Sequence, residues 1–473
     1  MPTILQWVQR LEAKIEDQRR YAEPFEVRYR NQRVLPFIQR EYAEVYGNGA
    51  VEQLSSGMRA PRSGTAAVVV DALADRLTVL GAASEDATAV RTVQAAWEAN
   101  DLDVMHREAH REALIKARAF GQVSRAASGD GAIVGIDAAE QMAVHREPGP
   151  PYDVDAALKV WTDEWTGRRK ARLWLPGWDI DLAEGEVTHD DPEGSKVRSR
   201  WVAEPEKASG LPVVPVVEFP CRPRLLAEPI SEIEPIDTLV DLVDLIDGLM
   251  VFAGHFGAVP IRWVTGLTIP RDPADKTKPL LGADGKPLLG FNPRADHLWA
   301  DTNPEAKFGQ LTPAALDSFV KWAEHASSRI RAKTGVASTY FSLDLRSHMS
   351  AELLKTDEAP MVRKVRSIGE RGSFGQAWRR LQQLILMIED PSSRALVRPR
   401  WESAATRVEA QDADVFVKVA PHLGAVTAAT EVLGWSLDKA QQGAAEARAA
   451  LAEASDPIGV TLRKPLFSSV DGN

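Results

Sequence analysis

Two histidines spaced four residues apart are the first feature of this sequence that could support chemistry. His106 and His110 would lie on one face of a helix, where both could reach a single metal ion. The intervening Glu108 is one place out of register with the H-E-x-x-H pattern, in which the glutamate acts as a base. The sequence suggests no third ligand. A metal-dependent hydrolase is therefore one alternative, and a solvated helix face in a charged segment is the interpretation we favour.

Phosphate-binding and nucleophile motifs are absent. Residues 282–287 (GADGKP) are too short for a P-loop and carry proline where the magnesium-binding hydroxyl belongs. Residues 129–131 (GDG) lack the third glycine of a dinucleotide site and are interpreted as a turn. No G-x-S-x-G nucleophile elbow is found. We therefore predict no enzyme activity, no catalytic residue, no cofactor and no metal.

Composition restricts the class of protein. The 473 residues include 57 basic and 67 acidic side chains, a net charge of −10, which argues against tight binding to phosphates. At 26% charged and 44% hydrophobic the chain is expected to be globular. Its one cysteine, Cys221, excludes a disulfide framework and fits a reducing compartment. Without a signal peptide or a spanning segment, we expect a soluble protein of intracellular type with no membrane partner.

The first half of the chain has the pattern of an α+β fold. Residues 1–60, Val68–Leu80 and Ala89–Ala119 show helical apolar spacing. Between about 120 and 220, short apolar runs alternate with Gly, Pro and Asp clusters, and Thr166–Arg169 suggests a hairpin turn. We predict an antiparallel sheet there.

Two long helices that flank a Pro- and Gly-rich excursion are the most distinctive feature. The first covers Pro235–Phe256 and carries two apolar rows; the second starts at the N-cap Thr312, runs to Lys333 and ends at Gly335. Each has about 22 residues, or about 33 Å. Together they are expected to form a stalk with residues 257–311 at its tip.

Beyond the stalk the sequence is mostly helical. Residues 335–348 form a short polar connection, too short to be deeply buried. A long helix is then predicted over 349–390, kinked or interrupted at Pro360 and loosened at Gly369–Gly375. Another helical block covers 410–455, and an exposed tail starts near Pro457.

The order of these segments resembles the portal (head-to-tail connector) proteins of tailed bacteriophages, in particular the long-tailed siphophage type. The likeness extends from about residue 20 to 455 and rests on degenerate motifs in a fixed order. These motifs are 68–77 (VVVDALADRL), the Trp97–Phe120 helix with 110–114 (HREAL), 211–219 (LPVVPVVEF), 222–224 (RPR), 231–234 (SEIE) and 350–355 (SAELLK) with Glu358 and Lys364.

The resemblance implies a predominantly helical α+β protein with portal-type architecture. It assigns 1–228 and 349–400 to the wing, the second range being its long helix, and 229–256 and 312–334 to the stem helices. Residues 257–311 would be the clip, 335–348 the tunnel loop, 401–455 the crown and 456–473 a C-terminal tail.

The resemblance also implies partners. About twelve copies would form a ring at one capsid vertex, through which double-stranded DNA passes without sequence specificity during packaging and ejection. Terminase large subunit, a head-completion adaptor, major capsid protein and scaffolding protein would contact the ring. The protein would be assembled in the host cytoplasm and remain in the virion.

Two groups of residues are candidate channel residues. The tunnel loop contributes Ser338, Thr339, Tyr340, Phe341, Ser342 and Arg346, where Arg346 either contacts phosphates or pairs with an acid such as Asp344. The acidic stripe of the first stem helix consists of Glu234, Asp237, Asp241 and Asp244, and faces either the lumen or solvent. An acidic duct would let DNA slide, because few phosphates are held. The remaining alternative is a capsid-associated or scaffold-like structural protein without a channel.

Overall fold

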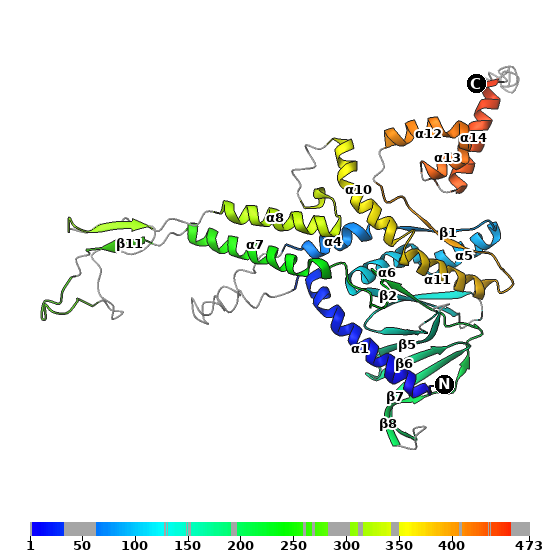
Figure 1. The fold of residues 1–473 in the computed structure, drawn as a ribbon, viewed down its shortest axis with the longest axis horizontal. Coiled ribbons are helices and arrows are strands. Elements are labelled where there is room, and N and C mark those ends of the chain that lie inside the picture. Colours follow the sequence, from blue (N-terminus) through cyan, green and yellow to red (C-terminus); the bar gives the residue numbers. More distant parts are fainter. Residues whose placement is uncertain are drawn as a thin grey trace, which may run out of the picture.

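The protein has a broad body at one end and a two-helix stalk that projects from it, as the computed structural model shows (Figure 1). The structure describes residues 2–32, 63–126, 129, 131–147, 149, 153–190, 196–258, 262–266, 270–281, 303–310, 316–341, 350–405, 409–433, 435 and 437–455. Helices and antiparallel sheets alternate in the body, so the predicted α+β fold class is confirmed.

In the described residues of the first part of the body the helices are α1 (Ile4–Tyr29), α4 (Thr65–Ala74), α5 (Ala87–Ala99) and α6 (Leu102–Lys116). Two sequence-based boundaries are wrong. The helix predicted over Val68–Leu80 ends at Ala74, and Leu80 lies in strand β1 (Val79–Ala83). The helix predicted over Ala89–Ala119 is two helices, because Asp101 adopts a left-handed conformation (φ 51°) that a continuous helix excludes.

Two antiparallel sheets follow, as predicted. The first has the order β10-β2-β3 and joins β2 (Arg118–Arg125), β3 (Ala132–Ala138) and β10 (Val216–Pro220). The second contains β4 (Met142–Arg146), β5 (Val154–Thr162), β6 (Arg169–Leu175), β7 (Trp178–Asp190), β8 (Lys196–Ala203) and β9 (Lys207–Ala208). The predicted hairpin turn joins β5 to β6, and Gly167 has the positive φ (66°) that the turn requires.

Helix α1 covers one face of the second sheet (Figure 1). Its residues Val8, Leu11 and Ile15 pack against Leu158, Leu173 and other buried residues of the strands. The helix starts with a capping box at Thr3, whose hydroxyl accepts from the Gln6 amide while the Gln6 side chain accepts from the Thr3 amide.

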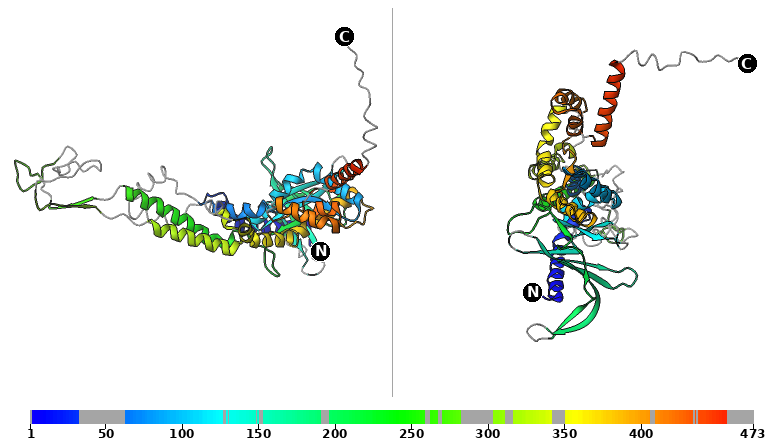
Figure 2. Two further views of the ribbon diagram at one scale, coloured as in Figure 1. Left: turned by 90° about the horizontal axis from the view of Figure 1, so that it is seen from above. Right: turned by 90° about the vertical axis from the view of Figure 1, so that its right-hand side faces the viewer.

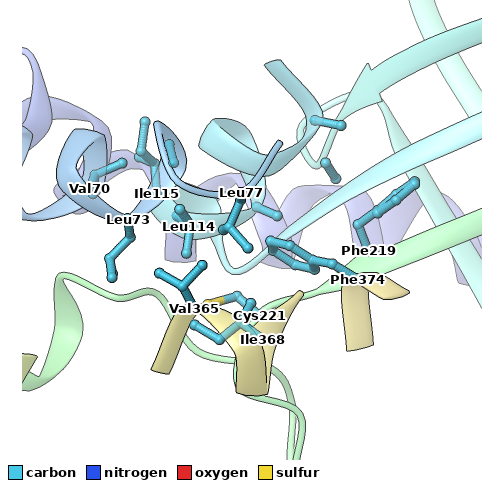
Figure 3. Close-up of a cluster of buried hydrophobic side chains, with 14 of the residues drawn as sticks. Val70, Leu73, Leu77, Leu114, Ile115, Phe219, Cys221, Val365, Ile368 and Phe374 are labelled. Carbon is cyan, nitrogen blue, oxygen red and sulfur yellow. The ribbon is translucent and has the colours of Figure 1, made fainter. Parts of the chain in front are cut away.

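The main core brings together segments far apart in the sequence (Figure 3). Leu73 and Leu77 from the first helical region and Leu114 from α6 lie over Val365 and Ile368 of α10 (Ala351–Ile368). Helix α11 (Ser373–Glu389) follows after a break at Gly369–Gly372, which lies where the sequence predicted loosening. The break needs glycine, because a Cβ on Gly372 would lie 2.0 Å from the Ser367 carbonyl oxygen. Pro360 lies inside α10 and does not end it.

The sequence did not predict strand β13 (Arg398–Trp401), which pairs antiparallel with β1. This pairing ties the segment after α11 back to the N-terminal part of the body. Three further helices follow: α12 (Glu409–Leu423), α13 (Ala425–Glu431) and α14 (Leu437–Ser455). The segment 410–455 is therefore helical as predicted, but it is divided into separate helices; Gly424 (φ 85°) separates α12 from α13. The predicted tail, 456–473, lies outside the described residues.

The stalk consists of α7 (Asp237–Ala258) and α8 (Asp317–Thr334), which lie side by side in Figure 1 and in the left view of Figure 2. At the far end β11 (Arg262–Thr265) pairs antiparallel with β12 (Lys307–Gln310). The predicted stalk is therefore present, with the described strands of the excursion beyond its end. Within the described residues helix α8 begins at Asp317, and Gly335 (φ 74°) ends it as predicted; Thr312 and Pro313, its predicted N-cap and first residue, lie outside the described residues.

Candidate functional site

The stalk packs mainly along one apolar row of each helix. Leu239, Val243 and Ile246 of α7 are buried, and so are Ala326 and Ile330 of α8. The second apolar row of α7, with Leu242, Leu245 and Leu249, is only partly buried, while Val320 and Trp322 of α8 are exposed. The single chain therefore leaves part of the apolar surface of its stalk uncovered.

The acidic stripe of α7 is bound by side chains of the same chain. Arg28, in the last turn of α1, contacts Asp241 at 3.2 Å and lies 4.0 Å from Asp237. Only 9% of the Arg28 side chain is exposed. The Glu234 carboxylate accepts a short hydrogen bond from the Tyr21 hydroxyl, and burial together with this bond raises the pKa of Tyr21. Arg28 and Tyr21 of α1 therefore connect the start of the stalk to the helix that covers the second sheet.

The last member of the stripe has a partner as well. Asp244 accepts hydrogen bonds from the backbone amide (2.8 Å) and the hydroxyl (2.7 Å) of Ser63. One turn further, burial and the nearby Asp244 raise the pKa of Asp247. The stripe is thus half-buried and internally paired, which neither the lumen nor the solvent alternative anticipated. Whether its remaining exposed edge faces a lumen stays a prediction.

Asp357 of α10 fixes the base of the stalk. Its carboxylate accepts from the backbone amide (2.6 Å) and hydroxyl (2.7 Å) of Ser338 and pairs with Arg331 of α8 (3.2 Å). Ser338 and Thr339 are buried. The expectation that the connection after α8 cannot be deeply buried is therefore wrong for its first residues, because Val336 and Ala337 anchor it in the main core.

Four of the six candidate channel residues lie in the described part of the connection after α8. The Ser338 hydroxyl is directed to Asp357, Thr339 is buried, and Tyr340 and Phe341 pack partly buried against the main core. These four side chains hold the connection to its own subunit. Ser342 and Arg346 lie outside the described residues, so the channel role of the loop stays a prediction that depends on them.

A buried carboxylate joins the stalk base to the body. Glu232 is fully buried and contacts both Arg222 (2.9 Å) and Lys364 (2.6 Å). Lys364 also donates to the Thr334 carbonyl at the end of α8 (2.8 Å). On the other side Lys333 donates to the Pro235 carbonyl just before α7 (2.8 Å). Both stalk helices are therefore held where they enter the body.

The sequence did not reveal these partners, because they lie far away along the chain. Arg28 and Asp241 are separated by 213 residues, and Lys364 and Glu232 by 132. One signal was available: no lysine or arginine occurs between Arg224 and Arg262, so any cation for the stripe had to come from another segment.

The histidine pair is a structural element and not a metal site. His106 and His110 are both buried, so the predicted solvated face is wrong for them. His110 Nδ1 lies 2.8 Å from the Leu77 carbonyl oxygen, and its Nε2 accepts from Trp378 Nε1 at 2.7 Å. Both ring nitrogens are therefore occupied. Burial lowers the pKa of His110 to about 3.

Other groups in the described ranges offer no catalytic arrangement. No cluster of three or more His, Cys, Asp and Glu side chains there could hold a metal ion. Cys221 is buried, and burial raises the pKa of its thiol well above the usual value, which keeps it an unreactive thiol. In the same ranges, no helix combines the length and the apolar character needed to cross a membrane.

Comparison with known proteins gives two curated relatives. The chain is 24% identical over 371 residues to the portal protein of Mycobacterium phage D29, which covers 74% of this chain and 70% of the relative. It is 26% identical over 392 residues to the portal protein of Mycobacterium phage L5, which covers 78% of this chain and 73% of the relative. No family model matches the chain.

Solved structures with a similar arrangement come from particle necks. The neck of an empty GTA particle, determined with C6 symmetry, has a TM-score of 0.41 at 11% identity and covers 79% of this chain and 89% of that chain. The neck of a native GTA particle with C12 symmetry has a TM-score of 0.41 at 12% identity, with the same coverage.

Proposed function

We propose that this chain, a phage portal protein, works as one subunit of a closed ring of about twelve copies at one capsid vertex, through which double-stranded DNA enters during packaging and leaves during ejection. The observation that carries the proposal is the match to two curated portal proteins, which extends over about three quarters of this chain. The body would form the wing, α7 and α8 the stem, the β11–β12 end the clip, and α12–α14 the crown.

The stalk supports the ring. A closed ring needs two different surfaces on each subunit, one for each neighbour. One apolar row of α7 packs within the chain, while the second row and the exposed Val320 and Trp322 of α8 remain for adjacent stalks. Burying them between copies would remove this apolar surface from water, which is the main driving force of such assembly.

The charge of the first stalk helix supports a channel. Helix α7 carries the paired carboxylates Asp237, Asp241 and Asp244 together with Asp247, Glu234 precedes it in a 3-10 turn, and α7 contains no lysine or arginine. Duplex DNA has one negative charge per about 1.7 Å of axis, so a basic wall would hold it, and a neutral or acidic wall lets it slide. Ser342 and Arg346, in the segment that leaves the stalk base, are proposed as the contacts nearest to DNA.

The remaining partners follow from this placement. We propose that the clip docks the terminase large subunit during packaging and a head-completion adaptor afterwards, while the wing contacts the major capsid and scaffolding proteins. The role is structural, and the energy for DNA translocation would come from the separate terminase. Assembly would take place in the host cytoplasm, and the ring would remain in the virion.

Native mass spectrometry of the full-length chain tests the ring. Twelve copies of a 51.8 kDa chain give a species of about 620 kDa, with a narrow distribution of subunit numbers. A scaffold-like structural protein without a channel would give monomers or an open series of oligomers. Only monomer across a range of concentrations and salt would contradict the proposal.

A further inference from the structure

A short loop at the end of β10 exposes two adjacent leucines. Leu225 and Leu226 are 95% and 108% exposed. Exposure of two large apolar side chains to water is unfavourable, and adjacent exposed apolar residues mark surfaces that bind a partner. Leu226 has φ 58° and Arg222, at the start of the loop, has φ 45°. Such left-handed conformations are unfavourable for a residue other than glycine, and they persist only where the surrounding structure holds them.

Ion pairs to the body hold both ends of this loop and so maintain the left-handed conformations of Arg222 and Leu226. Arg222 is paired with the buried Glu232 at 2.9 Å, and Glu228, on the other side of the loop, is paired with Arg118 at 2.5 Å. Arg118 itself is buried in the body. The loop from 222 to 228, here called the knob, is therefore clamped at both ends and presents its two leucines in a fixed direction.

A cavity of about 580 Å³ lies at the other end of the same strand. Val213, Val154, Leu384 and Met387 contribute apolar walls, and Val213 and Met387 are partly open to solvent. This cavity, here called the socket, is in the range of volumes that bind apolar groups in proteins.

One charge at the socket complements the knob. Arg224, beside the two leucines, is exposed and has no ion pair within the described residues. Of the charged side chains at the socket, Arg146 pairs with Glu218 at 3.2 Å, and Arg380 and Asp153 act on each other. Glu147 remains as an exposed carboxylate without an ion pair in the described part of the chain, and insertion of the leucines would bring Arg224 toward it.

Knob and socket cannot meet within one chain. The socket includes Val216 and Val217 at the start of β10, and the knob follows Pro220 at its end. Five residues of strand separate these ends by about 17 Å. Two complementary surfaces at opposite ends of one strand form the head-to-tail pair that closes a ring rather than a two-fold dimer.

We propose that the knob of each copy inserts Leu225 and Leu226 into the socket of the next copy around the ring. This inference rests on the proposed ring and names a contact between its subunits. The occupant of the socket is thus a second copy of this chain, and each copy both gives and receives one knob.

Disulfide cross-linking of the full-length chain tests the contact. The variant with Leu225→Cys and Val213→Cys, oxidised under mild conditions, should give a ladder of covalent multimers on a non-reducing gel, and reduction should collapse it to monomer. Each single variant should stay monomeric on the gel. A matched control pair replaces the knob position with another fully exposed side chain, Trp165→Cys with Val213→Cys, and should give no ladder. The natural Cys221 is buried and does not interfere.

The outcomes separate this inference from the proposed function. A closed ring by native mass spectrometry with no ladder would overturn the knob-and-socket contact and leave the ring intact. No ring for the wild-type chain would overturn the ring itself. An equal ladder from the control pair would also overturn the contact, since it would show collision and not insertion. As a second measurement, Leu225→Asp with Leu226→Asp should shift the ring toward smaller species, while Trp165→Asp should not.

Discussion

The guanidinium of Arg28, at the end of α1, contacts the carboxylate of Asp241, near the start of the first stalk helix, with 3.2 Å between Nη2 and Oδ2. Because α1 also covers the second sheet, this pair links the stalk to the body over 213 residues of sequence. A charge pair of this kind is costly to break on one side, since the remaining charge stays half-buried without a partner.

Replacement of Arg28 should loosen this link. Arg28→Ala is expected to lower the free energy of unfolding by about 1–3 kcal/mol, because Asp241 loses its charged partner. Urea unfolding measures the change, and Arg20→Ala on the same helix, 72% exposed, is the control. A double-mutant cycle with Asp241→Ala should show coupling between the two positions. Equal effects of Arg28→Ala and Arg20→Ala would contradict the clamp.

The connection after α8 should depend on Asp357. Asp357→Ala leaves the Ser338 amide and Arg331 without their acceptor, so residues 335–341 are expected to exchange amide hydrogens at least ten-fold faster, which corresponds to about 1.4 kcal/mol of lost protection. Hydrogen exchange with mass spectrometry measures the rate. Glu352→Ala, an exposed acid in the first turn of the same helix, should leave the rate unchanged. Unchanged exchange in both variants would show that Asp357 does not hold the connection.

His110 should make the fold sensitive to mild acid. Burial lowers its pKa from 6.5 to about 3. Between pH 6.5 and pH 3 the imidazole is therefore protonated in the unfolded chain and neutral in the folded chain. The stabilisation is complete above pH 6.5 and is lost as the pH falls, by about 2 kcal/mol at pH 5. His110→Gln should be less stable at pH 7 and should lose less stability between pH 7 and 5 than the wild type. The same pH dependence in both proteins would remove His110 as its cause.

The exposed edge of the acidic stripe can be tested by comparing Asp237 with the less exposed Asp241. The Asp237 side chain is 35% exposed and Asp241 22%, so Asp237→Lys should leave the ring assembled while Asp241→Lys, placed against Arg28, should destabilise the subunit. If the edge lines the channel, Asp237→Lys retains DNA through added phosphate contacts, and the yield of packaged DNA falls. Normal packaging in intact Asp237→Lys rings would place the stripe away from the lumen.

Periodicity and turn chemistry predicted much of this fold. The apolar spacing in Pro235–Phe256 and the glycine at 335 gave the stalk helices to within a few residues, and the Thr166–Arg169 turn gave the β5–β6 hairpin. These features depend on neighbours in the sequence. Strand β13 could not be predicted in the same way, because its four residues become a strand only by pairing with β1, more than 300 residues earlier.

The site was less predictable for the same reason. The hydroxyls of Ser338 and Thr339 suggested a polar surface, but Asp357 and the main core bury them. Likewise His106 and His110 lie in a segment rich in charged residues, yet both are buried, and His110 is bound by the indole of Trp378, 268 residues away. Side-chain type showed that partners were needed and could not show which distant segment provides them.

Cryo-electron microscopy of the purified full-length chain tests the central claim most directly. The account predicts a closed ring of about twelve subunits with a central hole wide enough for duplex DNA, α7 and α8 arranged around the axis, and the end of the stalk with β11 and β12 projecting from one side. Particles without a central hole, or a ring in which the stalks point away from the axis at the outer rim, would contradict it.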